Sequence, residues 1–325
     1  MQPIQFTALF FRLQELLASG PSISYNLSDL IFRRFRMRLN AFAKINWSLD
    51  ITGIREDGYH LLDMLMQPIS VADTISLLPS SGLRLTVSGC STLTPDDNNL
   101  ALRAARILKS ETGYSGGVEI HITKRIPVGA GMGGGSADAA GVLTGLNRLW
   151  HLGLTQPELE KLGLCLGADV PFCIRGGLVR TSGIGEKMTD LPYDHSIWLV
   201  VIQPDGSLST GAVFRAYDNS VPVLHPDNDL LCDALFRNDY NCFCRNLINV
   251  LQPVSSRLCP PISEAVSCLR RQGADAALMT GSGNAVFGVF PTRSAASDAQ
   301  KKLIADWPSA MLCHTQRNSV TFFDL

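Results

Sequence analysis

A run of glycines at residues 127–138, Pro-Val-Gly-Ala-Gly-Met-Gly-Gly-Gly-Ser-Ala-Asp, constrains this chain more than any other feature. Apolar residues alternate at 118–122 before the run, which is typical of a half-buried strand, and recur at helical spacing after it, up to residue 150. Glycine lets backbone N–H groups turn toward a ligand, and a helix N-terminus adds partial positive charge. The sequence therefore predicts a phosphate-binding loop between a strand and a helix; the alternative is a flexible glycine loop at the surface.

The neighbours of these glycines exclude three common kinds of phosphate loop. A Walker A loop needs a lysine after its last glycine, but Gly135 is followed by serine and alanine. Gly129, Gly131 and Gly134 fit the spacing of a dinucleotide fingerprint, yet the acidic residue expected about 20 residues further on is replaced by a helical pattern. No His-Arg-Asp or Asp-Phe-Gly motif of a protein kinase follows. The loop therefore belongs to another class of phosphate-binding protein.

Hydrophobic periodicity predicts an α+β chain with two domains. Thr155 and Glu158 form a capping box that opens a helix ending at Gly167, after which the chain is expected to run extended through 169–171. A boundary near 190–196 would separate residues 37–193 from residues 194–325. Strands are predicted at 39–51, 73–78, 83–87, 118–123, 197–202, 276–279 and 285–290, and further helices at 99–110, 208–218, within 228–251 and at 262–272.

The composition limits the class of protein. With 325 residues, 46% of them hydrophobic, the chain can bury a sizeable core. A net charge of -1 gives no basic surface for nucleic acid, and the apolar run at 197–202 is far too short to span a membrane. The nine cysteines lack the spacing of zinc or thioredoxin sites. We therefore expect a cytoplasmic protein with reduced thiols and with no nucleic-acid or membrane partner.

Residues 1–36 differ from the rest. They contain four arginines against two acidic residues, together with several serines, as in a targeting segment. They lack the basic start and the cleavage site of a secretory signal. We interpret them as a non-catalytic extension, and we assign no role to a short helix expected at 9–17.

The glycine run is similar to the second motif, Pro-x-x-x-Gly-Leu-Gly-Ser-Ser-Ala, of the galactokinase, homoserine, mevalonate and phosphomevalonate (GHMP) kinase superfamily. Two other motifs of that superfamily are present: Ala-Lys-Ile-Asn at 43–46, and a late glycine loop at 280–288. Asp-Gly-Tyr-His at 57–60 and Leu-Gly-Ala-Asp-Val-Pro-Phe at 166–172 complete five segments in the family's order. Together they most resemble the branch that phosphorylates a cytidyl diphospho-sugar alcohol in the non-mevalonate route to isoprenoids.

The resemblance implies a two-domain fold, ribosomal protein S5 domain 2-like before residue 194 and ferredoxin-like after it. It also implies a small-molecule kinase that uses ATP with Mg²⁺ and a cytidyl diphospho-sugar alcohol, as a monomer or a weak homodimer. The chain departs from the motif at Met132 and Ala137, where the superfamily usually has leucine and a second serine. Neither change removes a backbone N–H group, so phosphate binding is still expected.

The resemblance implies a catalytic pair. Asp169 would accept the proton of the acceptor hydroxyl, and Lys44 beside it would favour the ionised carboxylate and the developing alkoxide. Asn46 would orient the acceptor. On the residues alone, Lys44 also fits a lysine that reaches solvent from a sheet edge, and Asp169 fits a capping or turn residue.

The binding residues implied by the resemblance form two sets. Tyr59 and His60 would hold cytosine with Phe214 as the opposing ring, and the late glycine loop would hold the diphosphate; hairpin packing and a plain turn are the alternatives. Ser136 alternatively caps a helix, and Lys124 alternatively is a solvated charge. The ATP set is Lys124, Asn99, Leu100, Pro127, Val128, Gly129, Ala130, Gly131, Met132, Gly133, Gly134, Gly135, Ser136 and Ala137. The acceptor set is Asn46, Tyr59, His60, Thr210, Phe214, Gly281, Ser282 and Gly283.

Two other functions stay open on the sequence. One is a kinase of the same superfamily with another acceptor, against which Tyr59, His60 and the pattern at Asp169 argue. The other is a binding or regulatory protein without catalysis, against which the retention of both Lys44 and Asp169 argues.

Overall fold

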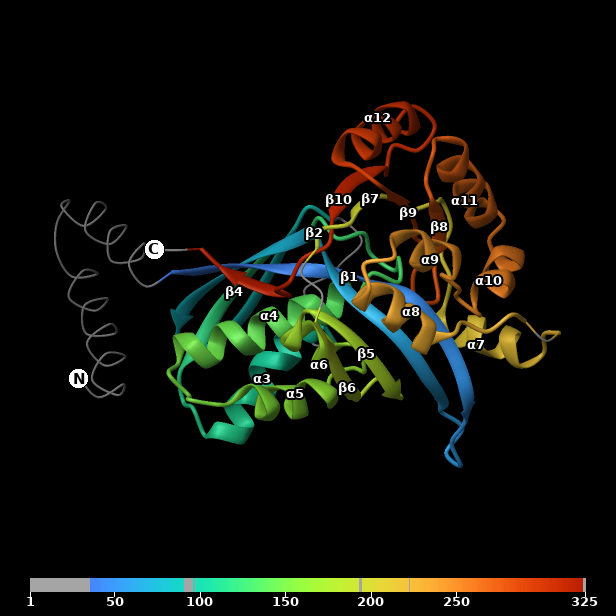
Figure 1. Ribbon diagram of the computed structural model, residues 1–325. Coiled ribbons are helices and arrows are strands. Elements are labelled where there is room, and N and C mark those ends of the chain that lie inside the picture. Colours follow the sequence, from blue (N-terminus) through green and yellow to red (C-terminus); the bar gives the residue numbers. More distant parts are fainter. Residues whose placement is uncertain (1–35, 91–95, 97, 193–194, 222, 324–325) are drawn as a thin grey trace.

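The computed structural model describes residues 36–90, 96, 98–192, 195–221 and 223–323. These residues form two β-sheets, each with helices packed against it (Figure 1). The extension predicted at residues 1–36, Arg36 apart, and the helix expected at 9–17 lie outside the described residues. None of the described helices is long and apolar enough to cross a membrane.

The first sheet is built around two long antiparallel strands, β1 (Met37–Ile54) and β2 (His60–Ser80). A turn that includes Asp57 and Gly58 joins them, and Gly58 has a φ of 85° that favours glycine. The other strands are β3 (Leu83–Ser88), β4 (Gly117–Thr123), β5 (Leu178–Gly183), β6 (Lys187–Leu191) and β11 (Val320–Phe322). The order is β11-β1-β2-β4-β3, with β5 paired to β2 and β6 to β5.

Four helices lie on one side of this sheet (Figure 1): α3 (Leu100–Thr112), α4 (Gly134–Leu149), α5 (Gln156–Leu164) and α6 (Val170–Arg175). Helix α4 packs closely because Gly145 has no side chain: a Cβ there would lie 2.5 Å from Leu77 Cδ1 and 2.7 Å from Leu39 Cδ2. The glycine run before α4 reaches the middle of β1, where the N–H of Lys44 donates to the carbonyl of Met132 at 3.0 Å.

The second sheet is fully antiparallel, in the order β10-β7-β9-β8. Its strands are β7 (Trp198–Ile202), β8 (Ala276–Met279), β9 (Val286–Phe290) and β10 (Met311–His314). Helix α11 (Pro261–Arg271) precedes β8, and α12 (Arg293–Leu303) joins β9 to β10, which gives the β-α-β-β-α-β pattern of a ferredoxin-like domain. The predicted two-domain α+β fold is confirmed. The remaining helices are α7 (Thr210–Asp218), α8 (Asn228–Phe236), α9 (Tyr240–Arg245) and α10 (Gln252–Leu258).

The chain returns to the first sheet at its end. Strand β11 pairs with β1, with Val320 opposite Ala41 and Phe322 opposite Leu39. The boundary between 193 and 194 stays a prediction, and the structure adds that one strand of the first sheet comes from beyond it.

Two local predictions have different outcomes. The capping box is confirmed, because Glu158 Oε2 accepts the backbone N–H of Thr155 at 2.7 Å. The extended segment expected at 169–171 is wrong, since α6 begins at Val170. Proline is tolerated in the first turn of a helix, where its missing N–H costs no hydrogen bond, so Pro171 permits this start.

Candidate active site

Two irregularities in the β1–β2 pairing place a short segment of β1 at the centre of the site. The register shifts between Phe42 and Lys44, and again between Asn46 and Ser48. Such bulges re-aim side chains and free backbone groups from the ladder. Here the N–H of Lys44 donates to the carbonyl of Met132 at 3.0 Å, and the N–H of Asn46 donates to the Thr280 hydroxyl at 3.0 Å. One segment of β1 therefore holds both glycine loops.

The two glycine loops also touch each other. The N–H of Ala285 donates to the carbonyl of Ala130 at 3.1 Å. Gly131 has a φ of 75°, and a Cβ at this position would overlap the carbonyl oxygen of Thr280. Only glycine permits this approach, so the phosphate loop and the late glycine loop form one continuous surface.

Buried polar side chains fix the late glycine loop from behind. Asn249 Nδ2 donates to the carbonyls of Met279 at 2.9 Å and Gly281 at 2.8 Å. Ser255 Oγ donates to the carbonyl of Ser282 at 3.1 Å. The prediction from sequence missed Asn249 and Ser255, because neither belongs to a glycine motif.

The phosphate loop has the backbone geometry of an anion site. Gly129, Gly131 and Gly133 all have positive φ values, of 70°, 75° and 69°. Gly133 is the N-cap of α4, so Ser136 lies inside the first turn, and the alternative in which Ser136 caps the helix is wrong. The first N–H groups of a helix have no partner within it and carry partial positive charge. The first turn of α4 holds no acidic residue to compete for them.

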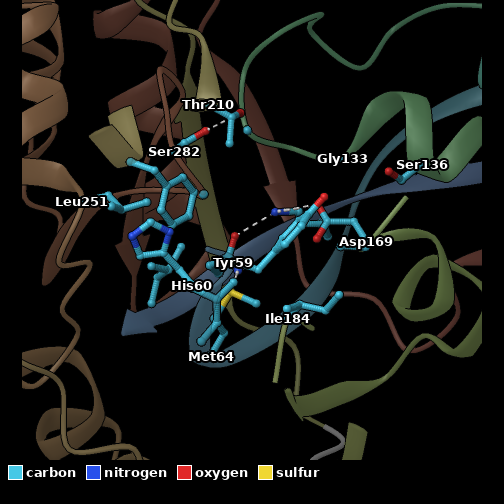
Figure 2. Close-up of a pocket in the computed structure, with 18 of the residues that line it drawn as sticks. Tyr59, His60, Met64, Gly133, Ser136, Asp169, Ile184, Thr210, Leu251 and Ser282 are labelled. Carbon is cyan, nitrogen blue, oxygen red and sulfur yellow. Dashed lines mark hydrogen bonds and ion pairs between the residues drawn. The ribbon is translucent and has the colours of Figure 1, made fainter. Parts of the chain in front are cut away.

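Lys44, Asn46 and Asp169 meet beside this helix terminus. Lys44 Nζ lies 2.8 Å from Asn46 Oδ1 and 3.4 Å from Asp169 Oδ2. The Lys44 side chain is 5% exposed and that of Asp169 is 36% exposed. The alternative in which Lys44 reaches solvent is therefore wrong. The arrangement is a buried cation next to an accessible carboxylate, and Figure 2 shows Asp169 facing the same space as Tyr59 and Gly133.

Aromatic residues also line this space. Tyr59 and His60 follow the turn between β1 and β2, and Phe214 lies on α7. The rings of His60 and Phe214 are 4.8 Å apart at 39°, and His60 Nε2 lies 2.7 Å from Asp218 Oδ1, also on α7. Tyr59 is exposed and its ring is open to a ligand. Asp218 was not predicted; it connects the hairpin to the second domain.

These groups line one cavity of about 550 Å³, a size usual for small-molecule sites. The predicted residues on its wall are Lys44, Asn46, Tyr59, His60, Gly131, Gly133, Ser136, Asp169, Thr210, Phe214, Gly281 and Ser282. The wall also contains residues that the prediction did not assign to the site: Leu49, Asp57, Gly58, Leu62, Met64, Ala168, Ile184 and Leu251. The predicted residues outside this wall are Lys124, Asn99, Leu100, Pro127, Val128, Gly129, Ala130, Met132, Gly134, Gly135, Ala137 and Gly283.

Asn99 and Leu100 lie beside the start of α4. Asn99 Oδ1 accepts the N–H of Ala101 at 3.0 Å and caps α3. A Cβ on Gly135 would lie 3.5 Å from Leu100 Cδ1. Leu100 therefore borders the start of α4, and Asn99 precedes it as the N-cap of α3.

Lys124 is not a solvated charge, so that alternative is wrong. Its side chain is buried beneath the loop, where Nζ pairs with Asp73 Oδ2 and, at 2.6 Å, with Asp138 Oδ2. Burial lowers the pKa of Lys124, but the two carboxylates outweigh burial and the net shift is upward. Burial raises the pKa of Asp138 to about 8, against the opposing effect of Lys124.

Comparison with known proteins identifies the family of the chain. Residues 99–177 match the GHMP kinases N terminal domain, and residues 222–309 match the GHMP kinases C terminal family. A protein of Geobacillus sp. (strain WCH70) is 43% identical over 256 residues, which are 78% of this chain and 88% of that protein. A protein of Clostridium tetani (strain Massachusetts / E88) is 38% identical over 280 residues, 86% of this chain and 100% of that protein. Both relatives are named 4-diphosphocytidyl-2-C-methyl-D-erythritol kinase.

Solved structures agree. The crystal structure of a 4-(cytidine 5'-diphospho)-2C-methyl-D-erythritol kinase superposes with a TM-score of 0.73 at 35% identity, covering 86% of this chain and 99% of that one. The homoserine kinase of Cytophaga hutchinsonii, at 19% identity, has a TM-score of 0.70 over 89% of this chain and 97% of that one, and shows the shared fold. The chain is a small-molecule kinase, and it belongs to the 4-diphosphocytidyl-2-C-methyl-D-erythritol kinase family of the GHMP kinases.

Proposed function

We propose that this chain transfers the γ-phosphoryl group of ATP to the tertiary hydroxyl of 4-diphosphocytidyl-2-C-methyl-D-erythritol, giving the 2-phosphate. The observation that carries this proposal is the shared cavity: the phosphate loop and the Lys44–Asp169 pair line the same space as Tyr59, His60 and Phe214, and Figure 2 shows Tyr59 between His60 and Asp169. A kinase acting on a long acceptor needs one cavity that holds both the reacting hydroxyl and the recognised base.

Asp169 is the general base in the proposed reaction. It takes the proton of the acceptor hydroxyl while that oxygen bonds to the γ-phosphorus and the bond to ADP breaks. Lys44 Nζ, 3.4 Å from Asp169 Oδ2, stabilises the ionised carboxylate and the negative charge that develops on the acceptor oxygen. Asn46 Oδ1 holds this ammonium at 2.8 Å, so the cation enters each cycle already oriented.

ATP lies along the phosphate loop in this proposal. The N–H groups at the start of α4 and the hydroxyl of Ser136 bind phosphate oxygens, and Asn99 and Leu100 lie toward adenine. The described residues contain no group of three or more His, Cys, Asp or Glu side chains that would hold a metal ion. Mg²⁺ would accompany ATP, because that ion keeps phosphate and water ligands and would neutralise phosphate charge without a protein cage.

The acceptor occupies the rest of the cavity. Tyr59 stacks on cytosine, His60 contacts its edge, and Phe214 is the opposing ring. Gly281 and Ser282 bind the diphosphate through backbone N–H groups, while the N–H of Gly283 donates to the carbonyl of Thr280 at 3.1 Å and shapes the loop. The Thr210 hydroxyl, 3.0 Å from Ser282 Oγ, borders the same place. We infer an enzyme of the cytoplasm that acts on small molecules as a monomer or weak homodimer.

The test is ADP release from Mg-ATP with three acceptors: the cytidyl diphospho compound, mevalonate and homoserine. Turnover is expected with the cytidyl compound alone. Turnover with mevalonate or homoserine instead would return Tyr59 and His60 to a structural role in the hairpin. No turnover with any acceptor, in a protein that binds nucleotide, would favour a binding protein.

Replacing Tyr59 by alanine is expected to raise the KM for the acceptor by about ten-fold or more, the loss that corresponds to one stacked base. The KM for ATP should stay unchanged, because the proposal assigns Tyr59 to cytosine and ATP to the phosphate loop. Tyr59→Phe is the matched control, since it keeps the ring and should keep the KM. Steady-state kinetics with each substrate varied in turn measures both values, and an effect on ATP alone would contradict the assignment.

A further inference from the structure

Three charged side chains lie buried beneath the phosphate loop, outside the cavity wall. Asp73 comes from β2, Lys124 directly follows β4, and Asp138 lies in α4. Their side chains are 0%, 3% and 7% exposed. Lys124 Nζ pairs with Asp73 Oδ2 and with Asp138 Oδ2. We call these three residues the buried charge cluster.

The cluster contacts the phosphate loop at both ends. Asp73 Oδ1 accepts the N–H groups of Arg125 at 2.5 Å and Ile126 at 2.9 Å, just before the glycine run. At the other end, a Cβ on Gly134 would lie 3.5 Å from Lys124 Nζ. The ammonium therefore lies directly beneath the first residue of α4, behind the N–H groups proposed to bind phosphate.

The net charge of the buried charge cluster is compatible with its position beneath the phosphate loop. A buried ion pair contributes little net stability, because desolvation offsets its attraction, so stability alone is a poor reason for this cluster. Two ionised carboxylates beside one ammonium would leave a net negative charge under the phosphates. Asp138 Oδ1 has no hydrogen-bond partner among the described residues, and burial raises the pKa of this carboxyl to about 8. The protonated form is favoured below that pH, which leaves Lys124 and Asp73 as a matched pair.

We propose that Asp73 and Asp138 are positioning residues of the phosphate loop. They hold the Lys124 ammonium beneath the N-terminus of α4, and Asp73 also fixes the turn at 125–126. Lys124 then acts on the nucleotide through the loop, by its charge, and not by direct contact. The inference rests on the proposed placement of ATP along the loop, and is independent of the acceptor.

Asp73→Asn separates this proposal from two alternatives. We expect the Kd for Mg-ADP, measured by calorimetry without acceptor, and the KM for ATP to rise about 10- to 100-fold, as for the loss of a charge-assisted hydrogen bond. The KM for the acceptor should stay within about three-fold. If Lys124 touches the nucleotide directly, the same change frees the ammonium and affinity holds or increases. If the cluster is only structural, the melting temperature falls while the affinity stays. Either result would overturn the proposal.

Asp63→Asn is the matched control. Asp63 lies on the same strand and accepts two hydrogen bonds from Arg180, at 2.9 and 2.7 Å, but lines neither the cavity nor the loop. Its replacement breaks an ion pair of β2 and should leave nucleotide affinity unchanged. Asp138→Asn should raise the Kd for Mg-ADP less than Asp73→Asn, because Asp73 still holds Lys124 and the turn.

If Asp73→Asn fails to fold, a double variant that removes the charges of both Asp73 and Lys124 tests the proposal instead. Asp73→Asn with Lys124→Met leaves no uncompensated buried charge, and folding is checked by circular dichroism. Affinity for Mg-ADP should remain about ten-fold reduced, because the positive charge beneath α4 is gone. Wild-type affinity in this double variant would refute the positioning role. Calorimetry with Mg-ADP needs no acceptor. If the wild-type protein binds Mg-ADP but does not turn over the cytidyl compound, only the proposed function is refuted and the positioning role can still be tested.

Discussion

Asparagine in place of Asp169 should lower kcat by about 10²- to 10⁴-fold, the range for loss of a general base. Asparagine keeps the shape of the side chain but cannot take the proton of the acceptor hydroxyl. Binding of Mg-ADP should change little, because Asp169 is assigned to the acceptor hydroxyl and ADP lacks the γ-phosphoryl group that this hydroxyl attacks. Single-turnover kinetics gives the chemical step, and calorimetry gives the affinity.

The control for Asp169→Asn is the same substitution at an exposed carboxylate. Asp233→Asn removes a surface ion pair with Arg237 and should leave both kcat and nucleotide affinity as they are. Turnover of Asp169→Asn at the rate of Asp233→Asn would remove Asp169 from the mechanism. Loss of Mg-ADP binding in Asp169→Asn would assign the carboxylate to the nucleotide site.

A methyl group at Gly131 should damage both substrate sites together. The added Cβ overlaps the carbonyl oxygen of Thr280, so the phosphate loop and the late glycine loop must separate. We expect kcat/KM to fall by at least about 100-fold, because a small misplacement of reacting groups costs this much. The KM values for ATP and for the acceptor should both rise.

Gly129 supplies the control for backbone strain. It has a φ of 70°, close to the 75° of Gly131, but a Cβ there meets no atom within 4 Å. Gly129→Ala and Gly131→Ala thus share the cost of a left-handed alanine, of order 1–3 kcal/mol. Only Gly131→Ala should weaken acceptor binding, and equal effects of the two variants on the acceptor KM would contradict the contact between the loops. Thermal unfolding of both variants measures the shared cost.

Much of the fold could be predicted because the signals are local. The glycine run, its flanking strand and helix α4 follow from backbone freedom and periodicity within residues 117–149. Strand β2 was predicted only in part, at 73–78, while the strand begins at His60. Its first part pairs with β1 on one side and β5 on the other, and it is held by burial and not by clear alternation.

Site residues that belong to sequence motifs were predicted, whereas residues that act through tertiary contacts were missed. Lys44 and Asp169 belong to motifs, but their 3.4 Å pairing depends on two bulges that no periodicity shows. Asp73 and Asn249 act on loops far away in sequence, so their roles appear only in the folded chain. Asp138 did carry a signal: an acidic residue between Ala137 and Ala139, on a helix face otherwise apolar, indicates a buried partner.

The pairing of β11 with β1 has a consequence for biosynthesis. Domains usually fold in order as a chain leaves the ribosome, the N-terminal one first. Here the edge of β1 at 39–41 receives its partner only after residues 320–322 have been translated. Until then the nascent first sheet exposes the unpaired backbone groups of that edge, which invite association with other strands. Strand β11, which is translated after every strand of the second sheet, therefore completes the first sheet.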